Sequence, residues 1–176
     1  MELPYGPQNS PVMRAAKTAL ETGNANYVLI WIPEESENTL KNILEKTCCI
    51  QSINKNMQNC AIDWYFETVN RLQSANRRML FTSLKPAGSD ESPRVLKVEK
   101  AIDTGNFEEI RSVIPPTHSG DVKQRFQQVM NKKNYPVNNI AAGRAYVSAF
   151  FDFIGYVHNL TSEIPGNGDR SKKKTR

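Results

Sequence analysis

The stretch Ala19-Leu20-Glu21-Thr22-Gly23-Asn24 returns 82 residues later as Ala101-Ile102-Asp103-Thr104-Gly105-Asn106. Each copy follows a Ser-Pro pair at the same distance, Ser10-Pro11 in the first half of the chain and Ser92-Pro93 in the second. Because so ordered a match without a gap is improbable by chance, we interpret it as an internal duplication. The two copies can therefore be used to predict each other's structure.

Each copy carries the start and stop signals of a helix. Ser10 suits an N-cap, Pro11 suits the first helical position, and Gly23 suits the left-handed residue at a helix end. After the glycine, Tyr27–Ile32 alone is typical of a buried strand, whereas its counterpart Phe107–Ile114 is typical of a short amphipathic helix. We let the clearer copy decide and predict a short helix in both halves, with a strand as the alternative in the first.

Two longer helices are expected in each half. They span about residues 35–48 and 53–75 in the first half, and about 120–132 and 138–160 in the second. Apolar residues recur along them at helical spacing, which predicts one buried stripe on each helix. The stripe predicted for residues 53–75 is Met57, Ala61, Trp64, Thr68 and Leu72. The stripes predicted for the other three are Leu40, Ile43, Leu44 and Thr47; Val122, Phe126, Val129 and Met130; and Ala142, Tyr146, Phe150, Phe153 and Val157.

The predicted fold class is all-α, with two pseudo-symmetric four-helix repeats packed as one helical bundle domain over residues 10–164. The predicted boundaries are an irregular arm over 1–9, repeat one over 10–75, a connecting loop over 76–91, repeat two over 92–164 and a disordered basic tail over 165–176. The connecting loop is long for a simple connection, which leaves open a structural or a functional role.

The net charge of +5 is concentrated at one end of the sequence. Residues 170–176 hold five of the 23 basic residues, which leaves 18 basic against 18 acidic residues elsewhere. A folded nucleic-acid-binding domain normally carries its basic residues as a patch on one face. We therefore expect nucleic acid or anionic lipid to be contacted only weakly, through this tail.

The sequence holds no run of about 18 apolar residues, so no transmembrane helix is expected. Its first residues lack the positive and apolar regions of a secretory leader, which predicts a cytoplasmic protein unless a leader has been removed. The cysteines Cys48, Cys49 and Cys60 lack the spacing of a zinc site and fit unpaired thiols in a reducing compartment. Cys49 and Cys60 remain weak candidates for a metal or redox role.

Catalytic motifs are missing from the sequence: it has no phosphate-binding glycine loop, no nucleophile elbow and no metalloprotease helix. Its two histidines, His118 and His158, are expected to be ordinary surface residues. We therefore predict no catalytic residues and no cofactor, and regard an enzyme as the less favoured class.

Charged residues lie among large aromatics on the two longest helices. Asp63, Glu67 and Arg71 occur on the first of them and Arg144 on the second. The plain interpretation is an exposed Glu67–Arg71 pair within one helix. The alternative is that Asp63 or Glu67 points inward and meets Arg144 at the repeat interface. These four residues, with Lys85 of the connecting loop, are the candidate ligand-binding residues.

Several motifs together resemble an uncharacterised family of small prokaryotic helical proteins, a domain of unknown function. They are Ala19–Asn24, Phe66-Glu67-Thr68-Val69 followed by Arg71, Leu84-Lys85-Pro86-Ala87-Gly88, and Ala142-Gly143-Arg144-x-Tyr146-Val147. The resemblance runs from about Pro11 to Tyr156. It implies an architecture and little biochemistry.

The chain departs from the family's pattern where a metal would be expected. Typical members look exported, and their mature chain begins with His-Cys-Asp before a Gly-Pro, whereas this chain has Pro4-Tyr5-Gly6-Pro7. It also has Gln73 and Gly155 where members tend to carry a histidine. An amino-terminal His-Cys could bind a transition metal. The resemblance thus implies that any metal site of the family has been lost here.

These observations favour a non-enzymatic helical accessory or interaction protein, with a protein partner or self-association. The alternative is a small-ligand or metal-binding protein, which could be redox-linked and would use the repeat interface or the cysteines. A weaker alternative is contact with nucleic acid or anionic lipid through residues 170–176.

Overall fold

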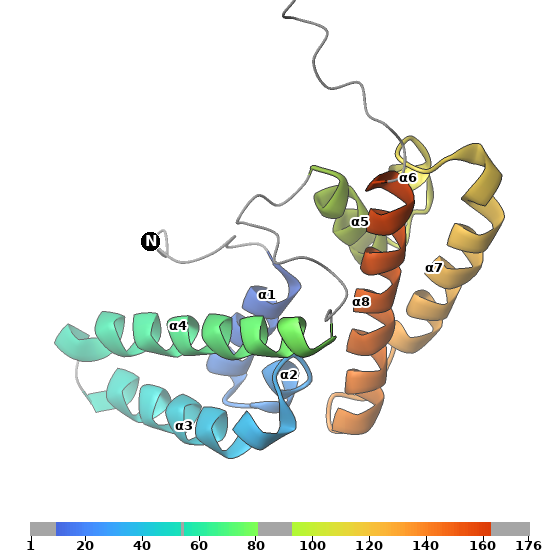
Figure 1. The fold of residues 1–176 in the computed structure, drawn as a ribbon. Helices are drawn as coiled ribbons and strands as arrows, with labels where there is room; N and C mark the ends of the chain where they lie inside the picture. Colours follow the sequence, from blue (N-terminus) through green and yellow to red (C-terminus); the bar gives the residue numbers. More distant parts are fainter. Residues whose placement is uncertain (1–9, 54, 81–92, 163–176) are drawn as a thin grey trace, which may run out of the picture. The chain divides into compact units, whose positions relative to one another are not determined.

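The structure is a computed structural model of the chain, and it describes residues 10–53, 55–80 and 93–162 (Figure 1). All the regular structure in these ranges is helical, which confirms the all-α prediction. The predicted arm, most of the predicted connecting loop and the predicted basic tail lie outside the described residues.

The described ranges contain α-helices joined by short turns and two 3₁₀ helices. In chain order they are α1 (Pro11–Thr22), α2 (Asn26–Leu29), η1 (Glu34–Ser36), α3 (Glu37–Ile53), α4 (Lys55–Leu80), α5 (Pro93–Thr104), α6 (Glu108–Arg111), η2 (Pro116–His118), α7 (Ser119–Lys133) and α8 (Ile140–Ser162). Helix α4 thus continues five residues into the stretch that was predicted to be a loop.

The first four elements of each half begin 82 residues apart. The series runs from Pro11 of α1 and Pro93 of α5 to Glu37 of α3 and Ser119 of α7. The predicted start of α1 is confirmed, because the Ser10 hydroxyl accepts a hydrogen bond from the Met13 N–H at 3.4 Å. The order of elements is therefore the same in both halves as far as the start of the third α-helix.

The turn after the first helix of each half also repeats in its hydrogen bonds. Gly23 and Gly105 adopt φ of 69° and 71°, the left-handed conformation that glycine allows without a Cβ clash. The side chains of Asn24 and Asn106 each accept a hydrogen bond from the N–H two residues further on, at 3.0 and 3.1 Å. Both halves therefore turn into their next helix by the same asparagine contact.

The stretch that resembled a strand is helical at its start. Helix α2 occupies Asn26–Leu29, and the Trp31 N–H then donates to the Val28 carbonyl at 3.0 Å. Every residue from Val28 to Ile32 is buried, which explains the apolar run that mimics a strand. The short-helix prediction is confirmed, and the strand alternative is wrong.

Contacts divide the chain into two compact units. Unit 1 comprises residues 1–86 and 132–148, and unit 2 comprises residues 87–131 and 149–176. The division does not follow the predicted repeats, because the segment 132–148 packs with the first half of the chain. Helix α8 begins in unit 1 and ends in unit 2.

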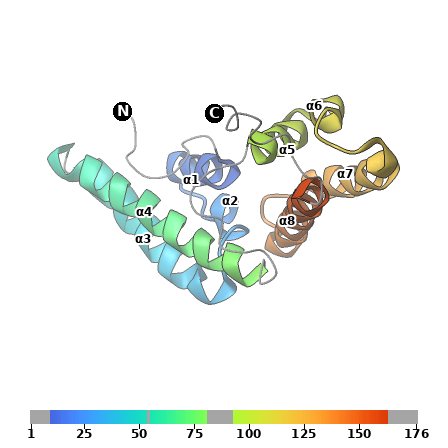
Figure 2. The same cartoon turned by 45° about the horizontal axis from the view of Figure 1, so that its top comes forward.

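In unit 1, α3 and α4 run antiparallel side by side, and α1 packs against α4 (Figures 1 and 2). The four residues predicted to face inward on α3 are all buried. The buried Tyr65 of α4 donates its hydroxyl to the Ala16 carbonyl of α1 at 3.1 Å. Burial, with a smaller effect of the nearby Cys48, raises the pKa of Tyr65 well above its usual range.

The predicted stripe of α4 is wrong at two of its five positions. Trp64 is 48% exposed and Met57 is 57% exposed, whereas Ala61 and Thr68 are buried as predicted. The large buried side chains of this helix are instead Tyr65, Phe66 and Val69. The buried face is thus rotated by about one residue from the predicted stripe, and Trp64 is not a core residue.

The core of unit 2 is a row of aromatic rings. Phe126 of α7 lies 5.6 Å from Phe107 and 5.9 Å from Phe153 of α8, measured between ring centroids. The guanidinium of Arg125 lies 4.1 Å from the ring centroid of Tyr156, a cation–π contact. The inward stripe predicted for α7 is buried at Val122, Phe126 and Val129.

Candidate functional site

Three of the predicted ligand-binding residues lie on α4. Asp63 is partly buried, and Glu67 and Arg71 are exposed. No ion pair joins Glu67 to Arg71 among the pairs between described residues. Another candidate, Lys85, lies outside the described residues. The structure thus places the α4 candidates on one helix without an ion pair between Glu67 and Arg71.

Arg144 of α8 meets carboxylates of unit 1, but other ones than predicted. Its guanidinium donates to a Glu37 carboxylate oxygen at 2.7 Å and lies 3.4 Å from a Glu34 oxygen. Arg144 and Glu37 are 28% and 19% exposed, whereas Glu34 is 85% exposed. The inward-facing interaction expected for Asp63 or Glu67 is thus made by the start of α3.

The Glu37 carboxylate is shared by two cations. Its second oxygen accepts from the Lys41 ammonium at 3.2 Å, one helical turn further along α3. Because Glu37 binds Arg144 through one oxygen and Lys41 through the other, its charge is compensated within unit 1. This geometry is that of a structural ion-pair network that fixes the first turns of α8 on the first turn of α3.

The residues on either side of Arg144 bring α8 close to the region after α2. A Cβ placed on Gly143 would lie 2.5 Å from Cγ2 of Ile30, so only glycine permits this approach. The Tyr146 ring contacts Trp31 edge-on at 6.3 Å and stacks with Tyr135 at 5.7 Å. The motif Ala142–Val147 is therefore used to dock α8 within unit 1.

The structure describes all three cysteines, Cys48 and Cys49 on α3 and Cys60 on α4. None of the three, all of which the structure describes, is in a disulfide. Burial, with a smaller contribution from Cys49, raises the pKa of the Cys48 thiol, which disfavours the thiolate that binds metals. The described residues also include no group of three or more His, Cys, Asp or Glu side chains able to hold a metal ion.

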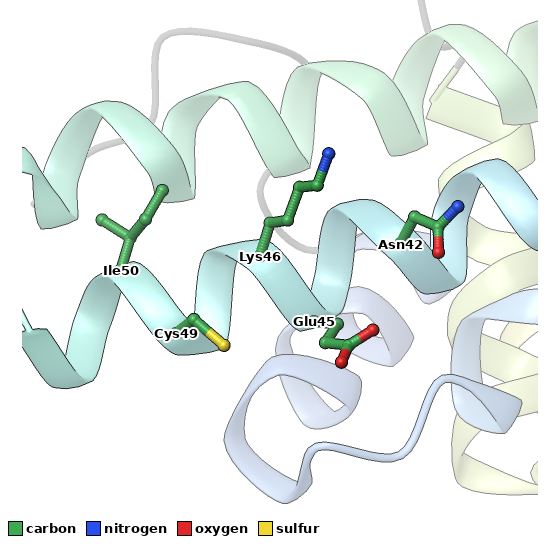
Figure 3. Close-up of a pocket in the computed structure, with 5 residues that line it drawn as sticks. All are labelled: Asn42, Glu45, Lys46, Cys49 and Ile50. Carbon is green, nitrogen blue, oxygen red and sulfur yellow. The ribbon is translucent and has the colours of Figure 1, made fainter.

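A surface hollow of about 410 Å³ lies along α3 (Figure 3). It is lined by Asn42, Glu45, Lys46, Cys49 and Ile50. Figure 3 shows that these side chains spread around the helix, with Lys46 directed toward α4 and Cys49 directed away from it. Since the lining comes from one helix and does not converge on a point, the hollow gives no geometry for a bound small molecule.

The exposed side of α4 carries a different kind of feature. Met57, Cys60, Trp64, Glu67 and Arg71 recur every three or four residues and are all exposed, and we name them the α4 outer face. Two large apolar side chains lie two helical turns apart on it, and a charged pair lies beyond them. Tryptophan is enriched among the residues that contribute most of the binding free energy at protein interfaces.

Sequence reasoning missed Glu34 and Glu37 as the partners of Arg144, and it missed the outer face. The sequence offered one signal for these two glutamates, because both lie in the acidic segment that directly follows Pro33. Glu67 and Arg71 were selected for their spacing, which is also what places them beside Trp64 on the outer face. His118, which was expected to be an ordinary surface residue, is partly buried, and its Nδ1 lies 3.0 Å from the Thr117 hydroxyl oxygen.

Within the described ranges, no helix has both the length and the hydropathy to span a membrane. Residues 9–156 match the family of unknown function DUF6448. Neither a curated protein nor a solved structure matches the chain.

Proposed function

The chain belongs to the family of unknown function DUF6448, and on that premise we propose that it is a non-enzymatic helical accessory protein that binds a protein partner. The contact surface in this proposal is the α4 outer face. The observation that supports it is the exposure of Trp64 and Met57, 48% and 57%, on one side of a helix that buries Tyr65 and Val69 on another side. Tryptophan and methionine are enriched at protein interfaces.

The charges beside Trp64 fit the same proposal. Glu67 and Arg71 lie one and two turns further along the face, so they would form a polar rim next to an apolar centre. Removing the apolar centre should cost much more binding free energy than removing the rim. In this proposal the candidate residues Glu67 and Arg71 contact the partner at the polar edge of the interface.

Affinity capture from the protein's own cells tests the proposal. Trp64→Ala should lose a partner that the unmodified chain retains, and the purified partner should then bind only the unmodified chain. Leu96→Ala is the matched control, because Leu96 is a 45% exposed apolar residue on another helix, α5. If Trp64→Ala retains the same partners with the same affinity, the α4 outer face is not the contact surface.

The alternative of a small-ligand or metal-binding protein keeps Asp63, Glu67, Arg71 and Arg144 as its candidates. Native mass spectrometry of untagged protein from its own cells separates the two proposals. Added mass matching a metal or small molecule would favour the alternative, and a second protein in the complex would favour the interaction role.

We also propose that the two halves arose by duplication. The support is the 82-residue offset, which relates the sequence motifs, the starts of the first four elements and the asparagine hydrogen bonds of each half. In this proposal α4 and α8 are counterparts with different uses, since α8 extends through both units and α4 stays in one.

A further inference from the structure

The α4 outer face carries two sulfur-containing side chains at a spacing that lets them act together. Met57 and Cys60 are three residues apart on α4, and both are exposed. Residues at this spacing are neighbours on a helix surface, with their Cβ atoms about 5–6 Å apart. A methionine side chain turns about three bonds, so its thioether can reach an ion that the cysteine sulfur also holds. The pair can therefore bind one metal ion between them.

The surroundings of the pair favour a cation. Trp64 lies one helical turn beyond Cys60 on the same face and is 48% exposed. The face of an indole ring attracts cations more strongly than any other aromatic side chain does. From Met57 to Glu67 the sequence has two carboxylates, those of Asp63 and Glu67, and no basic residue. The local charge therefore attracts a positive ion as well.

The donor atoms select the kind of ion. Thiolate and thioether sulfur are soft ligands, and they suit copper(I). Zinc takes four ligands from cysteine, histidine and carboxylate side chains, and the described part of the chain gathers no three such side chains into a possible metal site. Two sulfur donors beside an indole therefore fit a soft monovalent ion better than zinc.

The other exposed cysteine lacks this arrangement. The positions three and four residues from Cys49 hold Glu45, Lys46, Ser52 and Ile53, and none of them carries sulfur. Figure 3 also shows the Cys49 side chain directed away from α4. Cys49 is thus an exposed thiol without a thioether beside it, which makes it the internal control for Cys60.

We propose that Met57, Cys60 and Trp64 form a binding site for one copper(I) ion. The Cys60 thiol releases its proton to the solvent as its sulfur binds the ion, and the Met57 thioether is the second ligand. The indole of Trp64 lies against the bound ion in a cation–π contact. No electron is transferred, because the ion arrives and stays as copper(I). This inference goes beyond the proposed function and needs no protein partner.

Competition for copper(I) tests the site in the full chain. The ion is supplied as its ferrozine complex with ascorbate, to a Cys48→Ser, Cys49→Ser variant in which Cys60 is the remaining cysteine. This variant should take up one ion per chain, as counted by native mass spectrometry. Uptake should weaken as the pH falls, because the ion replaces the thiol proton. Far-UV circular dichroism checks that each variant remains folded.

Three further changes in the same background identify the ligands. Cys60→Ser should abolish uptake. Met57→Leu keeps an apolar side chain of similar size without the sulfur, and it should weaken binding by roughly tenfold or more, since even the loss of an outer partner of a metal has an effect of that size. Trp64→Leu should weaken binding by a smaller factor.

The matched control retains Cys49 as the remaining cysteine, through Cys48→Ser and Cys60→Ser, and it should not compete with ferrozine. Equal uptake by this control would overturn the proposal, as would an unchanged affinity in the Met57→Leu variant, because a thiol alone would then explain the binding. One ion shared by two chains would overturn it too.

The two proposals for this face can fail separately. If copper(I) binding ignores Met57 while Trp64→Ala still loses its protein partner, only this inference fails. If Met57→Leu weakens ion binding while Trp64→Ala keeps the partner, only the proposed function fails.

Discussion

The Tyr146 ring lies edge-on to the Trp31 indole, with their centroids 6.3 Å apart and their planes at 87°. Both rings are buried, and Tyr135 stacks on the same tyrosine. We expect Tyr146→Ala to lower the free energy of unfolding by about 3–5 kcal/mol, because the cavity removes both ring contacts. Tyr146→Phe keeps the ring and should lose much less. Urea unfolding measures both, and a loss below 1 kcal/mol for the alanine variant would contradict this packing.

Gly143→Ala should destabilise the protein by about 1–3 kcal/mol, because its Cβ would overlap the branched Ile30 side chain. Gly120→Ala is the matched control. Nothing lies within 4 Å of a Cβ at Gly120, which also sits in a helix, so alanine there should be neutral or should stabilise by about 0.5–1 kcal/mol. Equal effects of the two changes in urea unfolding would refute the close approach of α8.

Glu37→Gln should cost about 1–3 kcal/mol of unfolding free energy, because the Arg144 guanidinium loses a charged partner at 2.7 Å in a partly buried position. Glu34→Gln should change it by less than about 0.5 kcal/mol, since this glutamate is mostly exposed. A double-mutant cycle of Glu37→Gln with Arg144→Met isolates the coupling between the two residues. Coupling close to zero would show that the pair does not hold α8.

Replacement by alanine should lower the free energy of unfolding much more at Trp31 than at Trp64. Trp31→Ala removes a buried ring and should cost about 3–5 kcal/mol, whereas Trp64→Ala should cost only about 1–2 kcal/mol, because about half of this side chain is already exposed. Thermal or urea unfolding of both variants makes the comparison. Unfolding of the Trp64→Ala variant at normal temperature would restore Trp64 to the core and remove the α4 outer face.

Tyr65 should make the protein sensitive to high pH. Its pKa is raised in the folded chain, so the unfolded chain loses the phenol proton first, near its ordinary pKa of about 10. The stabilisation is therefore complete below pH 10 and declines above it, by at most about 1.4 kcal/mol per pH unit. Tyr65→Phe lacks this proton and should show a shallower decline. The difference between the two unfolding curves from pH 9 to 11 is the measurement.

The periodicity of the sequence was sufficient to predict the helices and most of the buried residues. The internal match was the strongest aid, because the clearly helical second copy corrected the strand-like Val28–Ile32 run of the first. The failure on α4 has a physical cause. Apolar residues occur on more than half of its circumference, so Trp64 and Tyr65 were equally plausible inward positions, and tertiary packing against Ala16 selects Tyr65.

The candidate site was less predictable than the fold. Arg144 was expected to meet Asp63 or Glu67, whereas its partners in the structure are Glu37 and Glu34. Helical spacing shows which residues share a face of one helix, but a contact across 107 residues depends on how helices pack. Gly143 could be recognised from the sequence as part of a motif. The reason why glycine is needed there is the close approach to Ile30, which only the structure shows.

The packing of α8 on the region after α2 sets an order of events during synthesis. Tyr146 follows Trp31 by 115 residues, so at about 5–20 residues per second the ribosome needs on the order of ten seconds to supply it. Until then Trp31 lacks its edge-on contact with Tyr146, and Ile30 lacks the close approach of Gly143. The amino-terminal half therefore cannot complete this part of its packing before the start of α8 has been made.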